Sequence, residues 1–339
     1  DWQTSLSIIY LKYKYGLIEH YCDIKTVYTI HNIAYQGVYG FAIINDVFDL
    51  PKKDGAILDY NGDINLMKGA IVCADKVSTV SPTYAKEILS PKFSHGLHYV
   101  LEQNKSKLVG ILNGIDREYY NPSKDDELFC NYSSRAIEKK YQNKVSLQKM
   151  LNLPEKPNTP ILAVISRLVD HKGLDLLTLA ADDILENDVQ LIILGKGEYY
   201  YENFFFHLAE RYPNKVSTLL TYNRDLSKKI YSGSDMFIMP SRSEPCGLSQ
   251  MIASRYGSVP IVRETGGLYD SIHDIGCEGG GNGFTFAPYS AWELLGAIKR
   301  AEALYDDKDA WKKLVKKVMN TDFSWKKSAN EYIEKLYNM

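Results

Sequence analysis

The chain has 339 residues, of which 45% are apolar, so it is long enough to bury a large core in two domains of ordinary size. Its 40 Lys and Arg residues nearly balance 42 Asp and Glu residues, without long runs of one sign, which argues against a nucleic-acid or membrane partner. Five scattered cysteines lack a C-x-x-C pair and predict neither a disulfide framework nor a zinc site, so we expect a cytoplasmic protein.

The first third of the chain alternates between strand and helix patterns. Residues 2–16 predict a helix, and the β-branched apolar runs at 24–30, 76–80 and 107–112 predict strands. Between the last two runs, Ser81 is a suitable N-cap for a helix that carries a proline in its first turn. This order predicts one α/β unit.

The stretch 151–160, LNLPEKPNTP, is rich in prolines and polar residues, and we place a domain boundary within it. The two predicted domains are therefore residues 1–155 and 156–339. The alternation then resumes, and from residue 290 onward the pattern is helical to the end. The strands expected in this second α/β domain are 161–166, 189–195, 216–220, 235–240 and 259–263.

Charged residues follow the strand at 161–166, in the stretch SRLVDHKGLDLL. Ligands of open α/β sheets bind at the carboxyl ends of the strands, where such residues are expected to lie. Arg167 and Lys172 together suit a diphosphate, because Arg offers a planar fork of donors and Lys a mobile point charge. The plainer interpretation is a pair of solvated loop charges, and this pattern alone leaves both open.

Two further stretches at strand ends combine glycines with polar groups. In PSRSEPCGLSQ (240–250), Gly247 and its neighbours Cys246 and Leu248 open a predicted helix, and Glu244 precedes it as a ligand contact or simply as a helix cap. In RETGGL (263–268) we expect a short helix from Leu268 onward. There the glycine pair Gly266 and Gly267 permits close backbone approach, and Thr265 offers a hydroxyl.

Several familiar patterns are incomplete. GKGEYY (195–200) lacks the third glycine of a dinucleotide fingerprint, so we interpret it as a tight turn near a nucleotide. His95 and His98 have metal-like spacing without a third ligand nearby in sequence, and Asp307 is expected to cap a helix. We therefore predict no metal and no other cofactor.

Long motifs in both halves resemble bacterial glycogen synthases and plant starch synthases over essentially the full chain. They include VYTIHNIAYQG, GILNGID, SRLVDHKGLDLL, PSRSEPCGLSQM and RETGGLYDSI, in the order and approximate spacing of that family. The resemblance implies a GT-B fold, that is, an α/β protein with two Rossmann-like domains facing a cleft and helices at the C-terminus. It also implies retaining transfer of glucose from ADP-glucose to the non-reducing end of an α-1,4-glucan, glycogen or starch.

The resemblance assigns roles to individual positions. Glu244 matches the key catalytic carboxylate beside the transferred glucose, and Arg167 and Lys172 match the residues that hold the diphosphate. His31 matches the histidine at the glucose, and Asp1 an aspartate on the acceptor side. The other residues implied at the donor are Asn113, Tyr222 beside the adenine, Cys246, Gly247, Leu248, and Thr265, Gly266 and Gly267 at the distal phosphate.

The sequence also departs from the family's pattern. The family's first strand and its K-x-G-G-L loop have no counterpart here, so we expect an incomplete N-terminal domain. Ile252 stands where many related transferases have a second glutamate. Glycogen synthases of this type also lack that glutamate. A catalytically inactive fragment or glucan-binding relic is the main alternative, and an NAD-type oxidoreductase is disfavoured. The sequence does not distinguish ADP-glucose from UDP-glucose as the donor, or a covalent intermediate from attack on the same face. It also predicts no oligomeric state.

Overall fold

The computed structural model describes residues 1–51 and 54–338, which form two compact units. Unit 1 contains Asp1–Asn113 and Lys326–Met339, and unit 2 contains Gly114–Trp325. Both are built on parallel sheets with helices, as the alternation of strand and helix patterns predicts.

Unit 1 has a parallel sheet of three strands in the order β1-β5-β6 and a small antiparallel sheet in the order β2-β4-β3. Ser81 caps a helix as predicted, because its Oγ accepts a hydrogen bond from the backbone N of Tyr84 at 3.0 Å. The elements are α1 (Ser5–Tyr13), β1 (Val27–Ile30), β2 (Val38–Tyr39), α2 (Ile43–Asp46), β3 (Asp59–Tyr60), β4 (Asp63–Asn65), α3 (Leu66–Cys73), β5 (Lys76–Thr79), α4 (Pro82–Glu87), α5 (His98–Gln103), β6 (Leu108–Gly110) and, starting one residue before the unit, α14 (Trp325–Tyr332).

Unit 2 has a parallel sheet of six strands in the order β12-β11-β10-β7-β8-β9. The chain fills one half of the sheet from β7 to β9 and then returns to β10, so the strand order reverses between β7 and β10. In such sheets the ligand site lies beside this reversal, at the carboxyl ends of the strands. The strands are β7 (Ile161–Ile165), β8 (Gln190–Leu194), β9 (Val216–Leu219), β10 (Met236–Met239), β11 (Val259–Arg263) and β12 (Phe284–Phe286), of which only β12 was not predicted.

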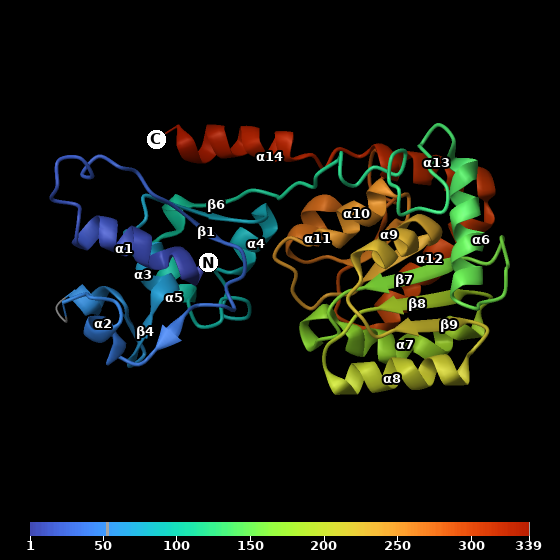
Figure 1. The fold of residues 1–339 in the computed structure, drawn as a ribbon, viewed down its shortest axis with the longest axis horizontal. Helices are drawn as coiled ribbons and strands as arrows, with labels where there is room; N and C mark the ends of the chain where they lie inside the picture. The colour runs from blue at the N-terminus through green and yellow to red at the C-terminus, as the bar shows by residue number, and fades with distance from the viewer. Residues whose placement is uncertain (52–53, 339) are drawn as a thin grey trace. The chain divides into compact units, whose positions relative to one another are not determined.

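The helices of unit 2 cover both faces of this sheet (Figure 1). Helices α7 and α12 pack against each other, as do α6 and α9 on the opposite face, and almost every strand residue is buried. The predicted C-terminal helices are present, interrupted at Asp307 and at residues 321–324. The helices are α6 (Lys140–Met150), α7 (Leu174–Glu186), α8 (Tyr199–Arg211), α9 (Arg224–Gly233), α10 (Ser249–Arg255), α11 (Gly266–Ser271), α12 (Ala291–Asp306) and α13 (Lys308–Asn320).

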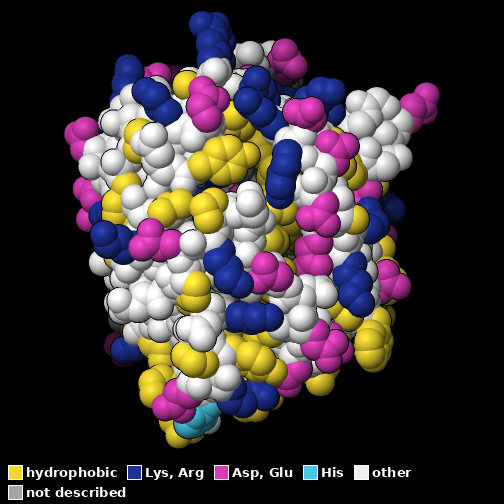
Figure 2. All heavy atoms as spheres, turned by 90° about the vertical axis from the view of Figure 1, so that its right-hand side faces the viewer, with side chains coloured by type: hydrophobic (Ala, Val, Ile, Leu, Met, Phe, Trp, Pro, Cys, Tyr) yellow, Lys and Arg dark blue, Asp and Glu magenta, His cyan; other side chains and the backbone are white. Residues whose placement is uncertain are grey.

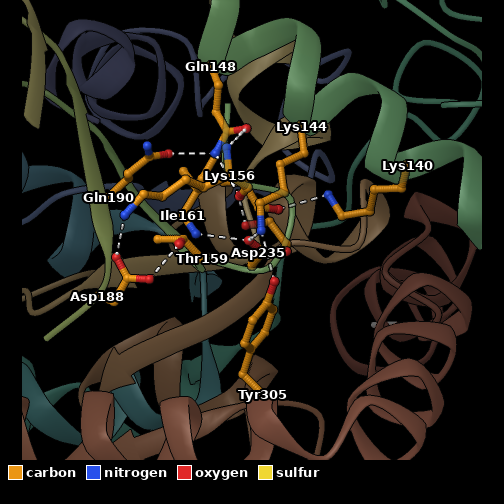
Figure 3. A network of polar contacts seen from close by, with 12 residues as sticks. Lys140, Lys144, Gln148, Lys156, Thr159, Ile161, Asp188, Gln190, Asp235 and Tyr305 are labelled. Atoms are coloured by element: carbon orange, nitrogen blue, oxygen red, sulfur yellow. Dashed lines mark hydrogen bonds and ion pairs between the residues drawn. The ribbon is translucent and has the colours of Figure 1, made fainter. Parts of the chain in front are cut away.

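The structure divides the chain at residue 113, whereas the sequence placed the boundary near residue 155. Residues 114–155 belong to unit 2 because α6 is anchored to its sheet by a buried polar network (Figure 3). Lys144 Nζ lies 2.7 Å from Asp235 Oδ2, which also accepts a hydrogen bond from the backbone N of Ile161. Lys140 Nζ donates to carbonyl oxygens at the end of α9. The proline-rich stretch is therefore a loop inside unit 2.

The face of the molecule that Figure 2 draws carries charged side chains of both signs. Figure 2 shows Lys and Arg side chains interspersed with Asp and Glu over this face, so neither sign dominates it. Within residues 1–51 and 54–338, no helix combines the length and the apolar character that a membrane crossing requires.

Candidate active site

Three loops meet at the carboxyl edge of the unit 2 sheet, after β7, β10 and β11. Glycines allow their close approach: a Cβ on Gly173 would lie 1.9 Å from the carbonyl oxygen of Pro240, and one on Gly266 would lie 2.0 Å from that of Glu244. Both glycines have positive φ angles, +70° and +44°, which other residues rarely adopt. The backbone N of Gly267 also donates to the Glu244 carbonyl at 3.1 Å. The loops therefore form one continuous surface.

Lys172 and Glu244 form an ion pair at the centre of this surface. Lys172 Nζ lies 2.7 Å from Glu244 Oε2, and the Oγ of Ser241 donates to the same oxygen at 3.0 Å. The side chains of Lys172 and Glu244 are only 17% and 8% exposed, which strengthens the pair because water screens it little. The β7 loop and the β10 loop are thereby joined through two residues of opposite charge.

Arg167 lies in the same β7 loop but is exposed and makes a different contact. Its Nη2 approaches His171 Nε2 at 3.5 Å. Burial, together with the neighbouring Lys172 and Arg167, lowers the pKa of His171 below its usual value. The loop therefore presents two cations flanking a ring that favours its neutral form.

A cavity of about 400 Å³ opens beside Arg167. It brings together the predicted residues Arg167 and Tyr222, and the side chain of Tyr222 is largely exposed at its wall. The turn at Gly195 and Lys196 also lines it, at the position where the sequence predicted a turn near a nucleotide. Apolar side chains of Ile165, Leu194 and Ile252 complete a wall that suits a flat ring, with the Arg167 guanidinium next to it for an anion.

Tyr120 and Arg224 are among the residues of this cavity that sequence reasoning missed. Tyr120 lies in the irregular segment before α6, and no local pattern links it to strand ends far along the chain. Arg224 directly follows Asn223, the N-cap of α9, and its guanidinium lies 5.7 Å from the centre of the Tyr119 ring. Its place right after a strand-end loop was a usable signal.

The remaining donor residues of unit 2 lie in the same loops. Thr265 is buried and directly precedes α11. This helix starts at Gly266, two residues before the predicted start at Leu268, because the chain turns into the helix directly after Thr265. Gly247 has a φ angle of +71° before α10. Cys246 is buried, whereas Leu248 is 45% exposed. Lys172, Glu244 and Thr265 do not line the cavity itself, whereas Arg167 of the β7 loop and Ser249 at the start of α10 do.

Unit 1 contains the three other predicted residues, all close to strand ends. The Asp1 carboxylate accepts hydrogen bonds from the backbone N of His31 at 2.8 Å and of Asn32 at 3.1 Å, which brings Asp1 and His31 together. Partial burial lowers the pKa of His31. Asn113 is half-buried in the segment that follows β6. All three therefore lie near the carboxyl ends of β1 and β6.

The described residues include no group of three His, Cys, Asp or Glu side chains that could hold a metal ion. Asp307 caps α13 as predicted, since its Oδ1 accepts from the backbone N of Ala310 at 3.0 Å. Reaction without a metal or another cofactor stays a prediction from the sequence.

Comparison with known proteins identifies relatives over the whole chain. The family model for the starch synthase catalytic domain matches residues 1–103, and that for glycosyl transferases group 1 matches residues 147–318. Glycogen synthases of Clostridioides difficile and Clostridium acetobutylicum are 45% and 46% identical over 337 residues, covering 98% of this chain and 70% of each relative. A glycogen synthase of Thermosipho africanus is 46% identical over 344 residues.

A solved structure is similar along the complete chain. The catalytic domain of starch synthase IV from Arabidopsis thaliana, bound to ADP and acarbose, matches with a TM-score of 0.93 and 35% sequence identity. The match covers 100% of this chain and 71% of that chain. It confirms the predicted GT-B fold class.

Proposed function

The chain belongs to the glycosyltransferase family of bacterial glycogen synthases and plant starch synthases, and on this premise we propose that it transfers glucose from ADP-glucose to an α-1,4-glucan. Glucose would be added to the non-reducing end with retention of configuration. The ADP and acarbose bound to the Arabidopsis relative support a nucleotide and a glucan as the two ligand classes. A cytoplasmic location stays a prediction from the cysteine pattern.

The observation that carries the proposal is the ion pair of Lys172 and Glu244 beside the cavity next to Arg167. The cavity would take the adenosine, with Tyr222 against the adenine. Arg167 and Lys172 would hold the diphosphate, and the Thr265–Gly267 turn its distal phosphate. Glu244 would then lie at the glucose.

These positions suggest how the chain's residues would act. As the bond between glucose C1 and the phosphate oxygen breaks, negative charge grows on the diphosphate and positive charge on the sugar. Arg167 and Lys172 would stabilise the first charge, and the Glu244 carboxylate the second. We favour attack by the acceptor hydroxyl on the face that the diphosphate leaves, because the sequence supplies no second carboxylate next to Glu244. His31 would contact the glucose, and Asp1 would lie on the acceptor side.

The test is transfer of labelled glucose to glycogen, with ADP-glucose and UDP-glucose in parallel. It should use this chain and the longest open reading frame that contains it. We expect transfer from ADP-glucose. Transfer from UDP-glucose alone would contradict the donor, and transfer from neither donor would favour the glucan-binding relic. Binding of glycogen without transfer would identify that relic directly.

A further inference from the structure

His171 occupies a central place among the cations of the candidate site, yet the proposed reaction gives it no role. It lies in the short turn Asp170–Lys172, directly before Lys172, and its ring is half-buried. Its carbonyl oxygen accepts a hydrogen bond from the backbone N of Arg242 at 3.0 Å, which ties the turn to the β10 loop. The backbone therefore holds the ring close to Arg167.

The guanidinium of Arg167 contacts this ring, because the nearby carboxylates are paired with another arginine. Among the residues that the structure describes, no carboxylate forms an ion pair with Arg167. The two nearby aspartates, Asp170 and Asp175, are paired with Arg242 instead, each at 3.2 Å. The side chain that approaches Arg167 is thus His171, with 3.5 Å between Nη2 and Nε2.

This contact requires a neutral imidazole. A guanidinium only donates hydrogen bonds, so Nε2 of His171 has to accept and cannot carry a proton. Burial disfavours the charged form of the ring, and so do the two cations that face it, Lys172 and Arg167. The carboxylates of Glu244 and Asp170 favour the charged form of the ring and so raise its pKa. The balance lowers the pKa of His171, so the ring is neutral near pH 7.

We propose that His171 is a positioning residue for the sugar-nucleotide donor: its neutral ring holds the Arg167 guanidinium toward the diphosphate, and protonation of the ring releases it. The inference rests on the proposed function, because it assumes that Arg167 binds the donor. Acidification would then weaken donor use through a group that touches neither the sugar nor the adenine.

The test measures kcat/KM for ADP-glucose between about pH 5 and pH 8. The diphosphate of ADP-glucose is fully ionised over this range, so the ligand itself does not titrate. We expect kcat/KM of the unmodified protein to fall about tenfold per pH unit on the acid side. His171→Leu, which cannot accept a hydrogen bond, should lose about tenfold at pH 8. His171→Gln, whose Oε1 accepts without titrating, should recover part of that loss and lack the acid fall.

His207→Gln is the matched control, because His207 lies on α8, is exposed, and pairs with Glu210 rather than with the candidate site. It should keep the unmodified pH profile. An acid fall that persists in His171→Gln would overturn the proposal and point to another group such as His31. A kcat/KM that rises on acidification would also overturn it, since the imidazolium would then bind the diphosphate directly.

A calorimetric titration with ADP-glucose separates this inference from the proposed function. If the unmodified protein transfers no glucose, the proposed function fails, and the affinities decide about His171 independently. Affinity that falls on acidification in the unmodified protein, but not in His171→Gln, would support the positioning role. Equal affinities for the unmodified protein and His171→Leu across the pH range would overturn it.

Discussion

Lys172 Nζ lies 2.7 Å from Glu244 Oε2, although the two residues are separated by 72 positions in the chain. The pair joins the loops on either side of the point where the strand order reverses. Each charge limits the cost of burying the other, because the two side chains are only 17% and 8% exposed. The cation that we propose for the phosphate and the carboxylate that we propose for the sugar are thereby held at one place.

Glu244→Gln should lower kcat for glucose transfer by about 10²-fold or more, because a neutral amide cannot stabilise the positive charge on the sugar. The measurement is steady-state transfer from ADP-glucose to glycogen. The control is Glu210→Gln, an exposed carboxylate on α8, which should leave kcat unchanged. A kcat near that of the unmodified protein would refute the role assigned to Glu244.

Lys172→Ala should raise KM for ADP-glucose and also lower kcat, since the ammonium is proposed to act on both the bound and the departing diphosphate. The substitution also leaves Glu244 without its partner, so folding should be checked by circular dichroism. Steady-state kinetics at several donor concentrations separates the two effects. If only KM for the glucan changed, Lys172 would belong to the acceptor side instead.

Gly173→Ala should lower the free energy of unfolding by about 2 kcal/mol or more. The added Cβ would collide with the Pro240 carbonyl oxygen, and the φ angle of residue 173 is positive. Chemical denaturation measures this. The matched control is Gly296→Ala within α12, where, among the described residues, no heavy atom beyond the adjacent residues and the helix's own backbone lies within 4 Å of the added Cβ. That change should raise stability by about 0.5–1 kcal/mol. Equal effects of both substitutions would contradict the close approach of the β7 and β10 loops.

Lys144→Met should destabilise the protein by about 3–5 kcal/mol, because it leaves Asp235 buried without its counter-charge. The side chains of Lys144 and Asp235 are 1% and 5% exposed. Lys156→Met is the control, since its pair with Asp188 is exposed and should cost about 1 kcal/mol or less. Thermal unfolding of both variants tests the difference, and a small loss for Lys144→Met would show that the network in Figure 3 does not anchor α6.

Glu302→Gln should stabilise the protein at pH 8 by about 1 kcal/mol, and the gain should vanish toward pH 4. Burial raises the pKa of Glu302 to about 7, and its Oε1 has no hydrogen-bond partner among the described residues. The folded state therefore holds the proton more tightly than the unfolded state, so ionisation of Glu302 costs stability as the pH rises from about 4.5 through 7. Denaturation across this pH range measures it, and a gain independent of pH would contradict the raised pKa.

The sequence by itself determined most strands of the two parallel sheets and their order along the chain. Apolar runs such as 189–195 and caps such as Ser81 and Asp307 depend on neighbours a few residues away, so local patterns revealed them. Its long motifs also identified the family and directed attention to Arg167, Lys172 and Glu244 before their positions in space were known.

Only the tertiary structure decided which of these residues meet. The order and register of the strands bring Glu244 to Lys172, place Tyr120 in the cavity wall beside Tyr222, and set the division of the chain at residue 113 rather than near 155. These contacts join segments that are distant in the chain, and their energies come from packing and buried charge rather than from local preference. A proline-rich stretch marks a break in secondary structure, but only the contacts around it decide whether a unit ends there.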